Sequence, residues 1–83
     1  MYSVQIEKQA LKYINKLDRP TARRIRDAID LIAEDPSIGK PLSEHGCERS
    51  YRVGGYRILY DIYDNQMIVV IVKVNPRGQV YDN

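Results

Sequence analysis

The chain has few of the residues from which metal sites and nucleophilic catalytic sites are usually built. Its 83 residues include one cysteine, Cys47, and one histidine, His45. One cysteine cannot form a disulfide within the chain, and two potential ligands fall short of a structural zinc site. A Ser-His-Asp arrangement is excluded unless His45 itself is the base. We therefore expect no metal ion and no cofactor, and we expect Cys47 to be a small buried apolar residue.

Long hydrophobic runs are also lacking, as are two of the three aromatic residue types. No window approaches the ~20 apolar residues of a membrane-spanning helix. The N-terminus has no basic segment followed by an apolar one, as a secretory signal peptide has. The expected location is therefore the cytoplasm, away from membranes. The sequence has seven tyrosines but no phenylalanine or tryptophan, so every aromatic side chain carries a hydroxyl that needs a partner when buried.

What is present is typical of one folded domain that spans residues 1–83. The hydrophobic fraction of 43% is too high for a disordered chain, and the length allows one modest core and no second one. Thirteen Lys and Arg stand against 11 Asp and Glu, a net charge of +2. A sum this small says little about partners, so the placement of the charges is what matters.

Hydrophobic periodicity predicts an α+β fold in the order β-α-α-β-β-β. Two helices are expected over residues 7–17 and 21–34. Each has apolar residues along the face that points inward, and the two are joined near Pro20. Four strands are expected over residues 2–6, 48–53, 56–63 and 67–74, with a hairpin turn at Gly54-Gly55. The nearly all-apolar last strand reads as a central strand covered on both faces. We expect the helical hairpin to pack on one face of a mostly antiparallel four-stranded sheet, which leaves the other face available for binding.

Five residues of the C-terminal part are candidates for phosphodiester chemistry: Arg49, Arg52, Arg57, Arg77 and Tyr81. The hairpin brings the first three toward one end of the sheet, and the tail can bring the last two to the same place. Guanidinium groups bind phosphate bidentately and stabilise charge that builds on it. A tyrosine can move a proton or stack on a base. The alternative is that these arginines form an ordinary solvated face.

A second basic set lies on the first predicted helix. Lys8, Lys12 and Lys16 recur every four residues and so share one face of that helix. Such a row can contact a nucleic-acid backbone. It is equally consistent with a plain helix surface.

The segment 49–62, RSYRVGGYRILYDI, resembles the central hairpin of the RelE/ParE superfamily of bacterial toxins. The Arg-Val-Gly-x-Tyr-Arg-x-x-Tyr core of this segment is fairly specific to the superfamily. The loop Gly39-Lys40-Pro41-Leu42 and the end of the chain, with Arg77 and Val80-Tyr81, also resemble corresponding parts of it. The resemblance covers nearly the whole chain and implies the RelE-like microbial RNase fold.

For RelE-like members, the resemblance implies a toxin that enters the ribosomal A site and cuts mRNA there without metal. The ribose 2′-OH attacks the adjacent phosphate. By this resemblance Arg57 and Arg77 hold the phosphate, and Tyr81 stacks on or orients the nucleotide or takes part in proton transfer. Arg52 matches a basic position on the preceding strand. The sequence also departs from the pattern of such enzymes. Glu48 and Ser50 stand where they carry basic residues, Pro76 stands where several have His or Lys, and the segment between Arg77 and Tyr81 is shorter.

The same resemblance leaves two other functions open. ParE-like members share the fold but inhibit DNA gyrase, and some relatives are catalytically inactive proteins that only bind antitoxin. We favour the RelE-like function because Arg57, Arg77 and Tyr81 occur together. The resemblance further implies a RelB-like antitoxin as partner, a ribosome with mRNA in the A site as target, and contact with operator DNA only through the antitoxin.

Overall fold

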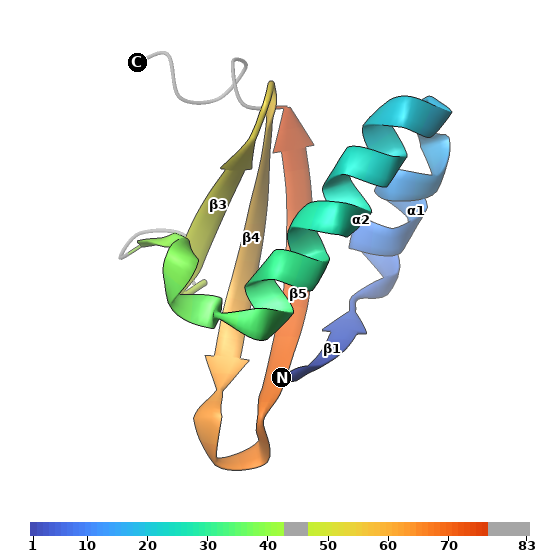
Figure 1. Cartoon of the computed structure of the whole chain (residues 1–83). Coiled ribbons are helices and arrows are strands. Elements are labelled where there is room, and N and C mark those ends of the chain that lie inside the picture. The colour runs from blue at the N-terminus through green and yellow to red at the C-terminus, as the bar shows by residue number, and fades with distance from the viewer. Residues whose placement is uncertain (43–46, 77–83) are drawn as a thin grey trace.

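The computed structural model describes residues 1–42 and 47–76, where two helices pack on one face of a sheet (Figure 1). The sheet has five strands in the order β1-β5-β4-β3-β2. Strand β1 pairs with β5 in parallel, and the other pairs are antiparallel. The elements are β1 (Ser3–Ile6), α1 (Lys8–Lys16), α2 (Arg19–Glu34), β2 (Lys40–Pro41), β3 (Arg49–Val53), β4 (Tyr56–Tyr63) and β5 (Ile68–Pro76).

The predicted α+β class and element order are confirmed, and the predicted number of four strands is corrected to five. The additional strand is β2, two residues that pair with the start of β3. A two-residue strand has no periodicity that sequence analysis can detect. A 3₁₀ turn at Pro36–Ile38 precedes it. No helix of the described residues is long and apolar enough to cross a membrane.

Helix α2 starts two residues before the predicted position because Asp18 caps it. The Asp18 carboxylate accepts hydrogen bonds from the Thr21 amide and hydroxyl at 3.1 and 2.9 Å, and Pro20 occupies the first turn, where no amide is needed. In α1, Ala10 and Ile14 are buried. Leu11 of the same helix is 41% exposed and does not belong to the core cluster.

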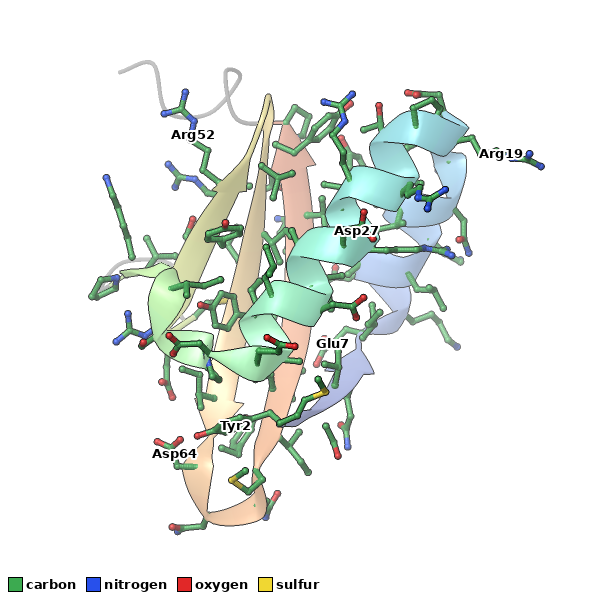
Figure 2. All side chains as sticks on the ribbon, viewed as in Figure 1. Tyr2, Glu7, Arg19, Asp27, Arg52 and Asp64 are labelled. Atoms are coloured by element: carbon green, nitrogen blue, oxygen red, sulfur yellow. The ribbon has the colours of Figure 1, made fainter. Side chains whose placement is uncertain are left out.

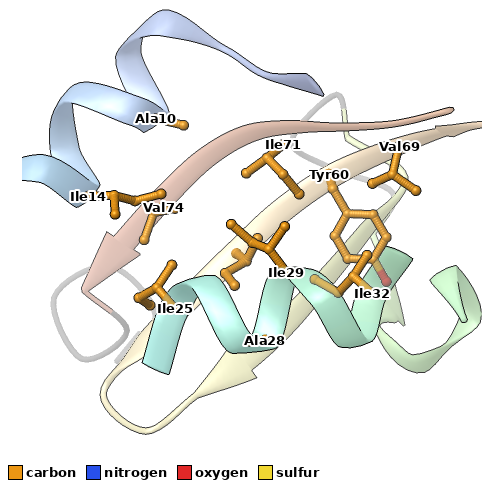
Figure 3. Packing of buried hydrophobic residues seen from close by; sticks show 11 residues of the cluster. Ala10, Ile14, Ile25, Ala28, Ile29, Ile32, Tyr60, Val69, Ile71 and Val74 are labelled. Atoms are coloured by element: carbon orange, nitrogen blue, oxygen red, sulfur yellow. The ribbon is translucent and has the colours of Figure 1, made fainter. Parts of the chain in front are cut away.

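The core lies between the helices and the sheet and contains one tyrosine, Tyr60 of β4, which is fully buried (Figure 3). The Tyr60 hydroxyl donates to the Pro36 carbonyl at 2.6 Å and accepts from the Gly39 amide at 3.0 Å. The hydroxyl is therefore satisfied, and it ties the chain before β2 to the core. The cluster comprises Ala10, Ile14, Ile25, Ala28, Ile29, Ile32, Ile58, Tyr60, Val69, Ile71 and Val74.

A bulge in β5 shifts the register between β4 and β5. Leu59 pairs with Lys73, whereas the next residue, Tyr60, pairs with Ile71, so Val72 is the extra residue. The Val72 carbonyl accepts a hydrogen bond of 3.1 Å from the Gln9 side chain of α1.

The expectation that β5 is covered on both faces is wrong. It is an interior strand, but Val70 and Val72 are only half-buried, and Lys73 is exposed. Both helices of the described part lie on the opposite side of the sheet (Figure 1). The sheet therefore has one face packed against the two helices and one face that no described helix covers, although Leu59 and Ser50 on that second face are themselves buried.

Candidate nucleic-acid interface

The candidate site lies on the open face, by which we mean the sheet face that carries Ser50, Arg52, Arg57 and Leu59. Ile58 points into the core, so its neighbours Arg57 and Leu59 point the other way. Directly opposed residues of an antiparallel pair share a face. Arg52 stands opposite Arg57, which pairs on its other side with Asn75. Two arginines are therefore adjacent at the end of the sheet next to the β3–β4 turn.

A second row of residues crosses the sheet beside this arginine pair. Lys40 pairs with Ser50, Ser50 with Leu59, and Leu59 with Lys73. All four residues therefore share the open face with the arginines. Lys40 was not among the predicted site residues. The signal that selects it is the register of β2, which becomes visible only in the structure.

A pocket of about 240 Å³ joins the two rows at the β2 side of the sheet. Ser50 forms part of the pocket lining and is 8% exposed. Arg52 is exposed and projects at the end of the sheet far from Tyr2 and Asp64 (Figure 2). We call this the cationic pocket, because its lining residues in the described part of the chain include three cations and no acid: Ile38, Lys40, Ser50, Tyr51, Arg52 and Arg57.

The other end of the open face has the opposite character. A second pocket, of about 370 Å³, is lined there by Glu7 and Asp61 together with polar and apolar residues of β1, β4 and β5. The Asp61 carboxylate accepts a hydrogen bond of 2.9 Å from the Glu48 amide. Cys47 is buried nearby, as expected, and burial followed by the negative charge of Asp61 raises the pKa of its thiol. The open face is thus positive at the hairpin end and negative at the far end, so a phosphate is attracted to the hairpin end.

Arg49 lies apart from the arginine pair. It stands opposite Tyr60, on the helix side of the sheet. Its Nη1 donates to the carbonyls of Ser37 and Gly39 at 3.3 and 2.5 Å. The guanidinium therefore stabilises the turn that leads into β2. The predicted contact of Arg49 with RNA is untested.

The structure does not bring the lysine row to the arginine pair. Lys8, Lys12 and Lys16 are exposed on α1, and the sheet separates this helix layer from the open face. Their predicted role in RNA binding remains untested. One further cation approaches the hairpin turn, because Arg24 Nη1 of α2 lies 3.7 Å from where a Cβ on Gly54 would stand.

Two of the predicted site residues, Arg77 and Tyr81, lie outside the described residues, as does His45. The predicted position of Arg77 and Tyr81 at the site is therefore untested. The last described residue, Pro76, pairs with Tyr56, next to Arg57 on β4. The described chain therefore ends at the arginine end of the open face. Within residues 1–42 and 47–76, no three His, Cys, Asp or Glu side chains come together as metal ligands do.

Fold and site together are those of a small α+β protein with a basic pocket on the uncovered face of its sheet. A profile of the ParE toxin of type II toxin–antitoxin systems (parDE) matches residues 4–81. The chain therefore belongs to this family, within the RelE/ParE superfamily of toxins.

Individual relatives agree with this assignment. Toxin RelG of Mycobacterium tuberculosis is 37% identical over an alignment that covers 96% of this chain and 95% of RelG. The fold matches the toxin–antitoxin complex RelBE2 from M. tuberculosis with a TM-score of 0.81 at 32% identity, over 92% of this chain and 98% of that one. It matches the archaeal RelE–RelB complex from Pyrococcus horikoshii with a TM-score of 0.77 at 28% identity, over 94% and 97% of the two chains.

Proposed function

We propose that the protein is a RelE-like toxin that cuts mRNA in the ribosomal A site and so stops translation. The observation that carries this proposal is the cationic pocket, where Lys40, Arg52 and Arg57 converge on the open face. A ribosomal target places the protein in the cytoplasm. Three cations on a face that no helix of residues 1–42 and 47–76 covers are suited to an RNA phosphate, since phosphate contacts dominate the affinity for nucleic acids.

The reaction we propose is an internal transesterification. The ribose 2′-oxygen forms a bond to the adjacent phosphorus, and the bond from phosphorus to the 5′-oxygen of the next nucleotide breaks. In net terms one proton moves from the 2′-oxygen to the leaving 5′-oxygen, carried by water or by the Tyr81 hydroxyl, which ends each turnover in the protonation state in which it began. The products are a 2′,3′-cyclic phosphate and a 5′-OH, and the protein contributes no atoms to either.

The arginines stabilise this reaction by charge. Arg57 binds the phosphate, whose negative charge increases in the transition state, and Arg52 fixes the RNA from the neighbouring strand. Arg77 and Tyr81 complete the site in this proposal, which is supported by the chain leaving β5 opposite Tyr56, at the arginine end of the sheet. Tyr81 orients the nucleotide or transfers a proton.

A RelB-like antitoxin is the partner that we propose for regulation. The toxin chains of the M. tuberculosis and P. horikoshii structures were both solved as complexes with their antitoxins. An antitoxin that covers the cationic pocket would neutralise it by charge complementarity and exclude RNA. Operator DNA is reached only through this antitoxin.

A second candidate function is inhibition of DNA gyrase, which the match to the ParE toxin profile favours. The nuclease and gyrase functions can be distinguished by adding purified, antitoxin-free toxin to an assay of protein synthesis and, in parallel, to an assay of DNA supercoiling by gyrase. We expect synthesis to stop and supercoiling to continue. The reverse result would assign the gyrase function, and no effect in either assay would assign a catalytically inactive, antitoxin-binding role.

The matched variant for these assays is the double substitution Arg57→Ala with Arg77→Ala. It should lose inhibition of protein synthesis while the unfolding transition stays that of a folded domain. Retained inhibition by a folded double variant would refute the role given to these two arginines.

A further inference from the structure

Lys40 is held at the cationic pocket by the shortest strand of the sheet. It pairs with Ser50, so its side chain leaves the sheet on the same face as those of Arg52 and Arg57. Arg52 follows Ser50 by two residues, which makes Lys40 and Arg52 diagonal neighbours with Cα atoms about 7–8 Å apart. Two long cationic side chains at this spacing can reach one small anion between them.

The residue before Lys40 is anchored on both of its polar backbone atoms. The Gly39 amide donates to the Tyr60 hydroxyl at 3.0 Å, and the Gly39 carbonyl accepts from Arg49 at 2.5 Å. A Cβ on Gly39 would overlap the Tyr60 hydroxyl oxygen, so glycine is required for this close approach. On the other side of β2, the Leu42 amide donates to the Glu48 carbonyl at 2.8 Å. The backbone that carries Lys40 is thus fixed from the core and from β3.

The space in front of Lys40 is suited to an anion. The pocket has a volume of about 240 Å³, and the largely buried Ser50 contributes a hydroxyl to its lining. Among its described lining residues three are cationic and none is acidic. An ammonium is a compact point charge, whereas a guanidinium binds two oxygens with a fixed geometry. A phosphate that receives both kinds of donor is held from two sides.

We propose that Lys40 is a phosphate-binding residue that contacts the same RNA phosphodiester as Arg52 and Arg57. The phosphate lies over Ser50, between β2 and the arginine pair. This assignment deepens the proposed function and rests on it for the choice of RNA as the ligand. It gives β2 a role, since the strand carries the third cation to the edge of the pocket.

The test is binding of a short, fluorescein-labelled single-stranded RNA to purified full-length toxin, followed by fluorescence polarisation over a range of salt concentrations. Lys40→Gln removes the charge at similar side-chain length. We expect it to weaken binding about tenfold at low salt, as for one lost charge-assisted hydrogen bond. We also expect the slope of log K against log salt to fall by about 0.7, the value for one phosphate on a single strand.

Lys73→Gln is the matched control, because Lys73 is exposed in the same row on the open face but does not line the pocket. It should bind RNA like the wild type. Lys40→Arg, which keeps the charge, should restore most of the affinity. Equal unfolding midpoints in urea for the three variants would show that the fold is unchanged.

The outcomes separate this inference from the proposed function. Lys40→Gln that binds RNA like the wild type overturns the inference, even if the wild type cuts mRNA on ribosomes. Absence of RNA binding by the wild type, or equal losses for Lys40→Gln and Lys73→Gln, overturns it as well. If binding depends on Lys40 but ribosomes show no cleavage, the phosphate pocket stands and the nuclease function falls.

Discussion

At the scale of single residues, Tyr60 connects the core to the site. Its ring belongs to the hydrophobic cluster, while its hydroxyl bonds both Pro36 and Gly39, immediately before β2. Burial raises the pKa of this hydroxyl, and the Gly39 amide opposes the shift. The hydroxyl therefore stays neutral and can donate to the Pro36 carbonyl. The position of Lys40 depends on a residue that never reaches the open face.

Replacing Tyr60 with Phe should destabilise the fold, since it leaves a buried amide and a buried carbonyl without partners. We expect a loss of about 1–3 kcal/mol in the free energy of unfolding, measured by urea denaturation. Tyr63→Phe on the same strand is the control, because Tyr63 is 49% exposed and should change stability by less than about 0.5 kcal/mol. Equal effects of the two substitutions would contradict the role of the Tyr60 hydroxyl.

At the scale of elements, the start of α2 depends on the ionised carboxylate of Asp18. Hydrogen bonds from the Thr21 hydroxyl and then from its amide lower the pKa of Asp18. The folded state therefore binds this proton less readily than the unfolded state does. The cap contributes its full stability above the ordinary carboxyl pKa, near pH 4, and loses it as pH falls through the lower folded value.

Asp18→Asn should separate the cap from its charge. Asparagine caps helices about as well as aspartate does, so the variant should match the wild type at neutral pH, whereas Asp18→Ala should unfold at a lower urea concentration. Below about pH 4 the wild type should lose stability more steeply than Asp18→Asn. Acid unfolding can be measured by circular dichroism. If stability fell equally steeply with pH in the wild type and in Asp18→Asn, this account would be contradicted.

The β3–β4 hairpin carries two cations in direct opposition, Arg52 and Arg57. Like charges at opposed positions destabilise a strand pair, and opposite charges stabilise it. Arg52→Glu should therefore unfold at a urea concentration no lower than that of the wild type. It should nevertheless lose RNA binding and toxicity, because it places a carboxylate in the cationic pocket. A folded Arg52→Glu variant that remains toxic would show that the pair is only a solvated face.

The larger elements could be predicted from the sequence, and the small irregularities could not. The apolar stripe of α2 and the alternation of β4 are long enough to show their period. Strand β2 has two residues, and the bulge at Val72 shifts a register that depends on tertiary pairing. Both lie below the length at which sequence patterns are informative. The fifth strand and the bulge therefore emerged only from the structure, whereas a second sheet face free of helices was expected from the helical hairpin.

The candidate site could be predicted only in part, because one of its residues lies on a strand too short to be detected in the sequence. Cross-strand pairing of Arg52 and Arg57 follows from the hairpin turn at Gly54-Gly55, which the sequence shows directly. The separation of Arg49 from them follows from strand alternation and its bonds to Ser37 and Gly39 carbonyls. Selecting Lys40 required the register of a strand formed by residues distant in the chain from β4.

At the scale of the whole molecule, the two faces of one sheet divide stability from recognition. One face is covered by α1 and α2 and forms the core, and the other holds a cationic end and an acidic end. This division fits the function that we propose, in which the open face is accessible to RNA in the free toxin and is covered by an antitoxin in the inactive complex. Salt should therefore weaken RNA binding strongly, since the proposed contacts are mainly with phosphates.

The most direct measurement is primer extension on mRNA from purified ribosomes programmed with the transcript and mixed with antitoxin-free toxin. The wild type is expected to cut within the A-site codon and leave a 2′,3′-cyclic phosphate and a 5′-OH. Arg57→Gln should lower the cleavage rate at least a hundredfold, as for loss of a group that stabilises transition-state charge. The account would be contradicted if the mRNA stayed uncut in the presence of folded, antitoxin-free wild-type toxin that arrests growth. It would also be contradicted if Arg57→Gln cut the mRNA as fast as the wild type.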